Sequence, residues 1–441
     1  MYKNTIHHHY FPAGFKWGVA TSSFQIEGAH LADGKGKSIW DTFCDDPINI
    51  ADQSNGDLAC DHYHLWPQDV DMIASLGVNA YRFSISWPRV QPDGEGEWNE
   101  AGFKFYENLM TALKSRGVGL HITLNHWDLP QALQDKGGWA NREICKKFVR
   151  YAAEVARRFE HMADSICTHN EPWVVAVLGH EHGIFAPGIK SRAVAMKVTH
   201  HLLLSHGMAL KALREIGIQT PLGIVLNLSP IYPASADPAD IAKAHLDDGL
   251  NLRWYMDPLT RGFYPEDVIA HLGSDMPHVQ EGDMAMIHQQ LDFIGVNYYT
   301  RNFSSTGNPW DVKSTGNEVT DMGWEVYPHG LTELLCRLHK DYDLPDVMIT
   351  ENGAAFKDVL IGGVIDDASR VQYFHDHIAA THAAIVQGVP VTGYFAWSLM
   401  DNFEWASGYE KRFGLIYVDY TTQKRTLKNS ALWYQNFLGG N

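Results

Sequence analysis

The sequence has few cysteines and no excess of basic residues. Its five cysteines in 441 residues are odd in number and widely scattered, without the paired spacing of a disulfide framework or a zinc site. They predict reduced, buried thiols in a cytosolic protein. Lys and Arg total 35 against 52 Asp and Glu, a formal net charge of -17, so we expect neither nucleic acid nor an anionic membrane surface as a partner.

No long apolar run or linker interrupts the chain. Residues 1–6 are followed by His7, His8 and His9 rather than by an apolar stretch, so we expect neither a secretory signal nor a transmembrane segment. Together with the cysteine usage, this predicts a cytoplasmic location. No stretch rich in Pro, Gly or Ser divides the sequence, and we therefore expect residues 1–441 to form a single domain with long loops.

Several signatures of other chemistries are missing. No glycine-rich dinucleotide turn follows the first predicted strand, and no Ser or Cys lies in a nucleophile elbow. The clusters His180-Glu181-His182 and His200-His201 have no i, i+4 histidine pair with a third ligand. We therefore expect no metal and no cofactor.

The chain does contain a repeated alternation of strand-like and helix-like stretches. Eight runs rich in β-branched and aromatic residues begin near Trp17, Asn79, His121, Ser165, Leu222, Phe293, Asp346 and Val391. Because right-handed βαβ units place such strands side by side, eight of them predict an α/β fold of the (β/α)8 TIM-barrel class. A doubly wound open sheet is the alternative, but the missing dinucleotide turn favours the barrel. The longest connections, about residues 28–64, 301–328 and 402–426, should form its mouth.

Local periodicity supports this assignment. Apolar residues recur at spacings of three and four over residues 144–159, which predicts a helix with one apolar face. In the second predicted strand, Tyr81 and Phe83 flank Arg82, which therefore points to the opposite face of the sheet. If the aromatic residues pack against the outer helices, Arg82 points to the barrel axis. An unpaired guanidinium is costly there, and Glu351 is the natural partner.

Two carboxylates lie where predicted strands end. Glu171 follows Asn170 and precedes Pro172, and Glu351 precedes an Asn-Gly turn. Most acidic side chains are simply solvated. Glycosidic bond cleavage, however, requires two carboxyl groups in one pocket, one to protonate the leaving oxygen and one to act at the anomeric carbon. Two strand-end carboxylates at one face of a barrel therefore indicate a glycosidase site.

These segments resemble glycoside hydrolase family 1, the β-glucosidase family, over essentially the full chain. The segments that carry the resemblance occur in order and cover residues 15–21, 25–28, 81–88, 126–130, 170–172, 297–299, 350–353 and 397–405. The resemblance implies a retaining mechanism with Glu351 as nucleophile and Glu171 as acid/base, their carboxyl groups about 5–5.5 Å apart. Arg82 and Tyr299 would favour the ionised form of Glu351, whose charge would raise the pKa of Glu171.

The resemblance also implies which residues bind substrate. The nonreducing sugar would contact Gln25, His126, Asn170, Tyr299, Glu404 and Trp405, with Trp397 as the stacking floor and Arg82 and Asn297 in support. Trp173, His180 and Trp324 are weaker candidates for the leaving-group side. His126 breaks the alternation of its strand, so its entry into the pocket calls for a bulge or a strand end.

Two residues beside the site depart from the family pattern. Asn125 precedes His126 where an aromatic residue is common, and His169 precedes Asn170 where an apolar residue is common. These departures can alter substrate preference, but they remove no chemical role.

The resulting hypothesis is a β-glucosidase that releases terminal β-D-glucosyl residues from aryl or alkyl glucosides and cello-oligosaccharides. β-D-Galactosyl and β-D-fucosyl groups remain alternatives, as does transglycosylation through the same intermediate. A 6-phospho-β-glycosidase is disfavoured because Glu404 would repel a phosphorylated sugar. A catalytically silent sugar-binding protein on the same scaffold is the alternative from a different class. The sequence leaves the oligomeric state open.

Overall fold

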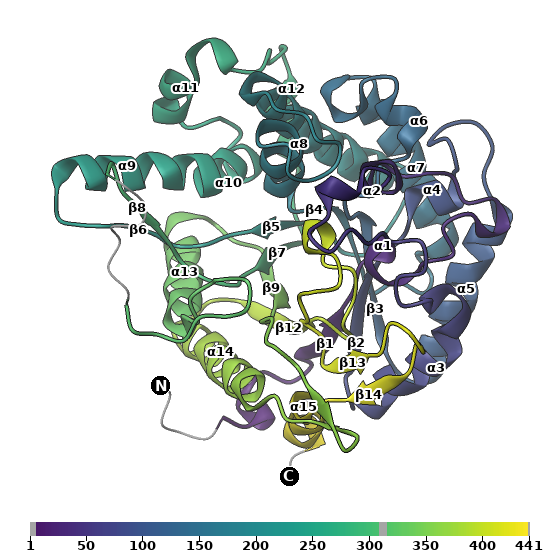
Figure 1. The fold of residues 1–441 in the computed structure, drawn as a ribbon. Coiled ribbons are helices and arrows are strands. Elements are labelled where there is room, and N and C mark those ends of the chain that lie inside the picture. The colour runs from purple at the N-terminus through teal and green to yellow at the C-terminus, as the bar shows by residue number, and fades with distance from the viewer. Residues whose placement is uncertain (1–5, 308–314, 440–441) are drawn as a thin grey trace.

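The computed structural model describes residues 6–307 and 315–439, and its centre is a closed barrel of eight parallel strands (Figure 1). The strand order is β1-β12-β9-β7-β5-β4-β3-β2, and β1 closes the barrel by pairing with both β2 and β12. This closure confirms the predicted (β/α)8 barrel and excludes the open sheet. The barrel strands are β1 (Lys16–Ala20), β2 (Ala80–Ser84), β3 (Gly119–Asn125), β4 (Ser165–Asn170), β5 (Leu222–Asn227), β7 (Phe293–Asn297), β9 (Asp346–Asn352) and β12 (Val391–Trp397).

Helices surround the barrel and short strand pairs lie in its connections. The helices are α1 (Ser23–Ile26), α2 (Ile39–Cys44), α3 (His62–Ser75), α4 (Trp87–Val90), α5 (Glu100–Ser115), α6 (Gln131–Gln134), α7 (Ile144–Phe159), α8 (Arg192–Glu215), α9 (Pro238–Asp248), α10 (Trp254–Thr260), α11 (Glu266–Leu272), α12 (Asp283–Ile287), α13 (Pro328–Asp341), α14 (Ala368–Val386) and α15 (Asn429–Gly439). The short strands pair as β6 (Ile231–Pro233) with β8 (Asn302–Ser304), β10 (Leu360–Ile361) with β11 (Val364–Ile365), and β13 (Ile416–Val418) with β14 (Arg425–Leu427).

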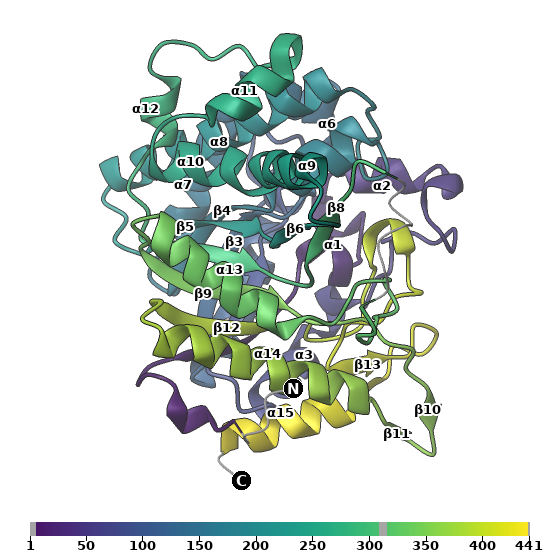
Figure 2. The same ribbon diagram turned by 90° about the vertical axis from the view of Figure 1, so that its left-hand side faces the viewer.

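The helices bury their apolar faces against the barrel. In α7, whose bounds match the predicted helix, the residues at spacings of three and four are all buried. Figure 2 shows α13, α14 and α15 side by side along one flank. No helix in the described part of the chain is both long and apolar enough to cross a membrane.

The β2 strand, Ala80–Ser84, has the two faces that its sequence predicts. Tyr81 and Phe83 stack with ring centroids 5.2 Å apart, and both are buried. Arg82 points the other way and contacts Glu351 inside the barrel. The predicted pairing of Arg82 with Glu351 is therefore confirmed.

Bulges interrupt the ladders where two strands lead into their loops. Along β4, Cys167 pairs with Gly223 but Asn170 pairs with Val225, so β4 contains one extra residue. Along β9, Ile349 and Glu351 pair with consecutive residues of β7, which again leaves one extra residue in β9. Because a bulge re-aims the side chains that follow it, these irregularities determine where Asn170 and Glu351 point.

Candidate active site

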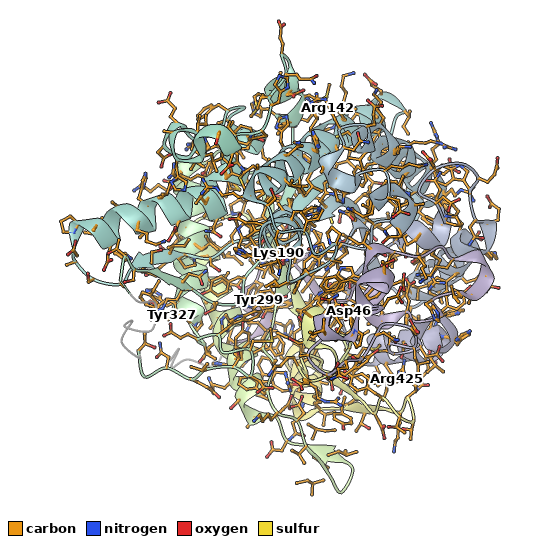
Figure 3. The ribbon with its side chains drawn as sticks, turned by 45° about the horizontal axis from the view of Figure 1, so that its top comes forward. Asp46, Arg142, Lys190, Tyr299, Tyr327 and Arg425 are labelled. Atoms are coloured by element: carbon orange, nitrogen blue, oxygen red, sulfur yellow. The ribbon has the colours of Figure 1, made fainter. Side chains whose placement is uncertain are left out.

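A cavity of about 280 Å³ lies at the carboxyl ends of the barrel strands. Such ends carry the active sites of TIM-barrel enzymes, because the loops that leave them converge there. The side chain of Tyr299, just beyond β7, lies near the centre of the molecule in Figure 3. The expected site residues that line this cavity are His126, Glu171, Trp173, Asn297, Tyr299, Trp324, Glu351, Trp397, Glu404 and Trp405.

Three other expected residues lie just behind the cavity wall. Arg82 and Asn170 are buried and contact side chains that line it. Gln25 is also buried, and its Nε2 donates to Asn402 Oδ1 at 2.9 Å and to the Phe403 carbonyl at 3.0 Å. Gln25 thereby positions the segment that leads to Glu404.

His180 differs from the sequence-based assignment. It is not among the residues that line the cavity. It lies in a π-helical segment, Val174–Glu181, where its Nδ1 donates to the Val175 carbonyl at 2.7 Å. The sequence made it a weaker candidate for the leaving-group side, but its ring is buried away from the cavity.

Glu171 and Glu351 belong to one hydrogen-bonded network. Arg82 donates from Nη1 to Glu351 Oε1 at 2.6 Å and from Nη2 to Asn170 Oδ1 at 2.7 Å. Asn297 donates from Nδ2 to Glu171 Oε1 at 2.5 Å and to Asn170 Oδ1 at 3.1 Å. Only the Arg82, Asn170 and Asn297 side chains therefore separate the two carboxyl groups along the network. Since Glu171 and Glu351 are 5% and 3% exposed, almost no bulk water screens one from the other.

The two carboxyl groups differ in their partners. Burial raises the pKa of Glu351, while the Arg82 guanidinium and the Tyr299 hydroxyl, which donates to Oε2 at 2.6 Å, oppose that rise. Burial and, next, the charge of Glu351 raise the pKa of Glu171 to about 8. Because Glu351 has the cationic partner, the negative charge of the pair resides on Glu351 and Glu171 is protonated at neutral pH.

Glu404 is a third carboxyl group at this cavity. Burial, together with the charge of Glu351, raises its pKa to about 8, and the Gln25 side chain opposes that rise. A protonated Glu404 can donate as well as accept a hydrogen bond, which suits recognition of hydroxyl groups.

Three residues that line the cavity have left-handed backbone conformations. Their φ angles are +77° at Trp127, +49° at Glu171 and +49° at Trp405. Non-glycine residues rarely adopt this region, and such strain concentrates at functional sites because the surrounding structure must maintain it. The conformation at Glu171 follows directly on the bulged end of β4.

His126 enters the site where β3 ends, as its position in the sequence required. The strand stops at Asn125, and Asn170 Nδ2 donates to His126 Nε2 at 3.1 Å. An amide nitrogen only donates, so this bond assigns the imidazole proton to Nδ1. Burial lowers the pKa of His126 well below its usual value, and the ring is neutral. Its ring lies nearly parallel to that of Trp397, with centroids 5.9 Å apart.

The loops contribute differently from the sequence-based expectation. Residues 301–328 and 402–426 do reach the cavity, through Trp324 and Trp405, but no residue of 28–64 lines it. Instead, Trp40 packs against Trp405 with ring centroids 4.6 Å apart. That connection supports the wall from behind.

Sequence reasoning also missed part of the lining. The missed residues are Trp127, Val174, Leu178, Phe185, Asn227, Leu228, Ser229, Asn251, Thr300, Asn302, Met322 and Phe413. Asn227 could have been found from the sequence, because it is a polar residue at the end of a barrel strand, β5, as Asn170 is at the end of β4. Met322 lies in the connection 301–328 that was expected at the mouth, whereas Asn251 lies in none of the expected segments and had no such signal. Among residues 6–307 and 315–439, no group of three or more His, Cys, Asp or Glu side chains is arranged to hold a metal ion.

Comparisons with known proteins agree with this architecture. Residues 7–441 match the family described as glycosyl hydrolase family 1. A β-glucosidase A from Acetivibrio thermocellus is 46% identical over 98% of both chains. A 1,4-β-D-glucan glucohydrolase from Thermotoga neapolitana is 44% identical over 98% of both chains. The solved family 1 β-glucosidase from Thermotoga maritima in complex with isofagomine lactam superposes with a TM-score of 0.95 at 44% identity, covering 99% of this chain and 100% of its own. The chain therefore belongs to glycosyl hydrolase family 1.

Proposed function

We propose that the protein is a retaining β-glucosidase in which Glu351 is the nucleophile and Glu171 the acid/base. The observation that carries this proposal is the hydrogen-bonded network that links Glu171 to Glu351. Two buried carboxyl groups share a network, yet only Glu351 is paired with a cation, while burial and the charge of Glu351 raise the pKa of Glu171 to about 8. One group is thus suited to attack and the other to donate a proton.

The reaction has two half-reactions. In the first, Glu351 attacks the anomeric carbon, the bond to the leaving oxygen breaks, and Glu171 gives its proton to that oxygen. The covalent ester removes the charge of Glu351, so the pKa of Glu171 falls and its carboxylate becomes a base. In the second, Glu171 takes a proton from water, whose oxygen attacks the anomeric carbon and releases Glu351. Direct attack requires carboxyl groups about 5–5.5 Å apart.

The same cavity provides groups for the terminal sugar. We assign its hydroxyl groups to His126, Glu404 and Trp405, which line the cavity, and to Asn170 just behind its wall, and its apolar face to Trp397. We also assign Gln25 to this set, from behind the wall: both hydrogens of its Nε2 are engaged with Asn402 and Phe403, and its Oε1, which accepts from Ser22 Oγ at 2.6 Å, has a second lone pair for a hydroxyl group.

The leaving group lies toward the outer part of the cavity. We assign it to Trp173 and Trp324, which line the cavity and are partly exposed, and whose indole rings offer flat apolar surfaces. Tyr299 joins the two sides, since its ring contacts Trp324 with centroids 5.3 Å apart while its hydroxyl reaches Glu351.

The substrate we propose is a terminal β-D-glucoside, either a small aryl or alkyl glucoside or a short cello-oligosaccharide from cellulose breakdown. The names of the relatives from Acetivibrio thermocellus and Thermotoga neapolitana support glucose as the sugar. No Lys or Arg is among the described residues that line the cavity, which disfavours a phosphorylated sugar. A cytoplasmic location is supported by the five cysteines, all free and four of them buried.

Replacement of Glu351 by Gln tests the assignment. Without a nucleophilic carboxylate, kcat for p-nitrophenyl β-D-glucoside should fall by about 10³-fold or more, because no covalent intermediate forms. The exposed Glu97→Gln is the matched control and should retain wild-type activity. NMR of the wild-type reaction should show the β-anomer of glucose as first product. Full activity of Glu351→Gln, or an α-anomer as first product, would reject the mechanism.

A further inference from the structure

We propose that Asn125 and His169 form a positioning pair that sets the placement of His126 and Asn170 against the terminal sugar. This inference rests on the proposed function, since it concerns how the sugar site is held. Neither residue lines the cavity, and each lies one position before a residue assigned to the sugar.

The two residues bond to each other across neighbouring strands. Asn125 of β3 and His169 of β4 are paired in register, and Asn125 Nδ2 lies 3.1 Å from His169 Nδ1. Both side chains are buried. The departures from the family pattern at these two positions are therefore one complementary change, because each polar side chain satisfies the other.

This bond is the first of three consecutive links between the two strand ends. Asn170 Nδ2 donates to His126 Nε2 at 3.1 Å, and Trp127 Nε1 donates to the Asn170 carbonyl at 2.8 Å. Residues 125, 126 and 127 thus each bond to residue 169 or 170. Because these residues are consecutive along each strand, a change in the Asn125–His169 bond also displaces the Asn170–His126 bond.

The bulge in β4 makes such support necessary. It lies between Cys167 and Asn170, and it turns His169 out toward α7 and α8 while Asn170 points into the barrel. The Phe148 ring stacks on the imidazole with centroids 4.4 Å apart, and Trp139 contacts its edge at 5.3 Å. These rings limit sideways movement, and Asn125 determines how far the imidazole turns.

The hydrogen bonds require one state of His169. The Asn125 amide nitrogen donates, so Nδ1 accepts and Nε2 carries the hydrogen that it donates to Ser205 Oγ at 2.9 Å. Burial lowers the pKa of His169 well below its usual value, with a smaller contribution from His206. The neutral ring therefore has one link to the site and one to α8.

Asn170 connects the Asn125–His169 pair to the reacting groups. Asn170 Oδ1 accepts from both Arg82 and Asn297, which in turn donate to Glu351 and Glu171. Movement of β4 at His169 therefore loosens the sugar contacts of Asn170 first. Asn125 and His169 touch no reacting atom, so they act through Asn170 and His126.

Two substitutions of His169 separate this role from simple anchoring of α8. His169→Asn keeps an acceptor near Nδ1 for Asn125 but loses the donor to Ser205. His169→Gln keeps a donor near Nε2 for Ser205 but loses the acceptor for Asn125. Asn125→Leu removes the amide at similar volume. We expect kcat/KM for p-nitrophenyl β-D-glucoside to fall about tenfold, mainly through KM, in His169→Gln and Asn125→Leu, and less than about threefold in His169→Asn.

The double variant Asn125→Leu/His169→Gln should lose no more than either single variant, because both remove the same bond. Equal losses in His169→Asn and His169→Gln, or wild-type KM in Asn125→Leu, would overturn the proposal. If His169→Gln does not fold, Asn125→Leu and His169→Asn still test the pair. If the wild-type protein does not hydrolyse the glucoside, the proposed function fails. Calorimetric binding of D-glucose to the same variants then tests the pair without catalysis.

Discussion

Glu171 and Glu351 have the same side chain, but their neighbours give them different charges. Arg82 and Tyr299 both donate to Glu351, whereas Glu171 accepts from the uncharged Asn297. The alternation of residue types around Arg82 was enough to predict its pairing with Glu351. The role of Asn297 as the link between the two carboxyl groups depends on a third strand, and no local pattern indicated it.

The pH dependence of catalysis follows from Glu171. Its pKa lies near 8, and its protonated form is the acid, so kcat/KM should decline as pH rises through about 8. Between the usual value of 4.5 and about 8, the folded protein binds a proton that the unfolded chain releases. This group's contribution to stability is therefore complete below 4.5 and declines as pH rises through that window.

A pH series of kcat/KM and of thermal unfolding measures both effects. Because the pKa of Glu404 is also near 8, the series is repeated with Glu404→Gln. The alkaline limb should remain in that variant. Its disappearance would assign the limb to Glu404 and contradict the acid role of Glu171.

At the scale of the elements, β9 and β12 approach each other closely where they lead into their loops. A Cβ atom at Gly353 would lie 1.7 Å from the Trp397 carbonyl oxygen and 2.8 Å from its carbon. Only glycine permits this approach, which brings the strand that carries Glu351 beside Trp397. The Asn-Gly sequence suggested a turn, but the actual requirement is a contact with a strand about forty residues away in the chain.

Gly353→Ala should therefore separate the two strand ends. We expect a loss of about 1–3 kcal/mol in the free energy of unfolding, as for other overpacked sites. We also expect a fall in kcat/KM, because Glu351 and Trp397 both move. Denaturant unfolding and glucoside kinetics measure the two effects. The control is Gly307→Ala, where a Cβ atom would meet, among residues 6–307 and 315–439, only Ser305 Oγ at 3.5 Å. Equal stability of the two variants would contradict the close packing.

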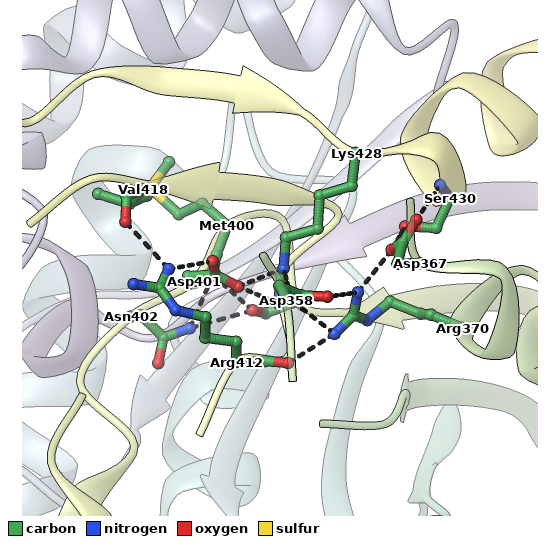
Figure 4. Close-up of polar contacts among 12 residues, drawn as sticks. Asp358, Asp367, Arg370, Met400, Asp401, Asn402, Arg412, Val418, Lys428 and Ser430 are labelled. Carbon is green, nitrogen blue, oxygen red and sulfur yellow. Dashed lines mark hydrogen bonds and ion pairs between the residues drawn. The ribbon is translucent and has the colours of Figure 1, made fainter. Parts of the chain in front are cut away.

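At the scale of the whole molecule, a buried cluster of charged side chains links several segments that are distant in the sequence (Figure 4). It comprises three acids and three bases, Asp358, Asp367, Asp401, Arg370, Arg412 and Lys428. Lys428 donates to Asp358 Oδ2 at 2.5 Å and to Asp401 Oδ1 at 2.6 Å. The cluster links the loop after β9, the start of α14, the loop after β12 and the segment before α15. The segments that carry Glu351 and Glu404 thus share one support.

Lys428→Met should destabilise the protein strongly. It removes the cation that Asp358 and Asp401 share, so that Asp358 is left with Arg370 and Asp401 with Arg412. Removing one partner from a buried ion pair costs about 3–5 kcal/mol. Thermal and urea unfolding measure the loss. The exposed Lys424→Met is the matched control and should change little. An unchanged unfolding midpoint for Lys428→Met would show that the cluster does not contribute to stability.

The sequence by itself determined the strand and helix periods, the barrel, the two strand-end carboxylates and the partner of Arg82. Most of these features depend on alternation and spacing within short segments, and the partner of Arg82 follows from the cost of an unpaired charge at the barrel axis. Only the tertiary structure decided that residues 28–64 support the wall instead of lining it, that His180 turns inward, and that Asn125 meets His169. Those outcomes depend on bulges and on contacts between distant segments, and no local pattern encodes how far a bulge turns a side chain.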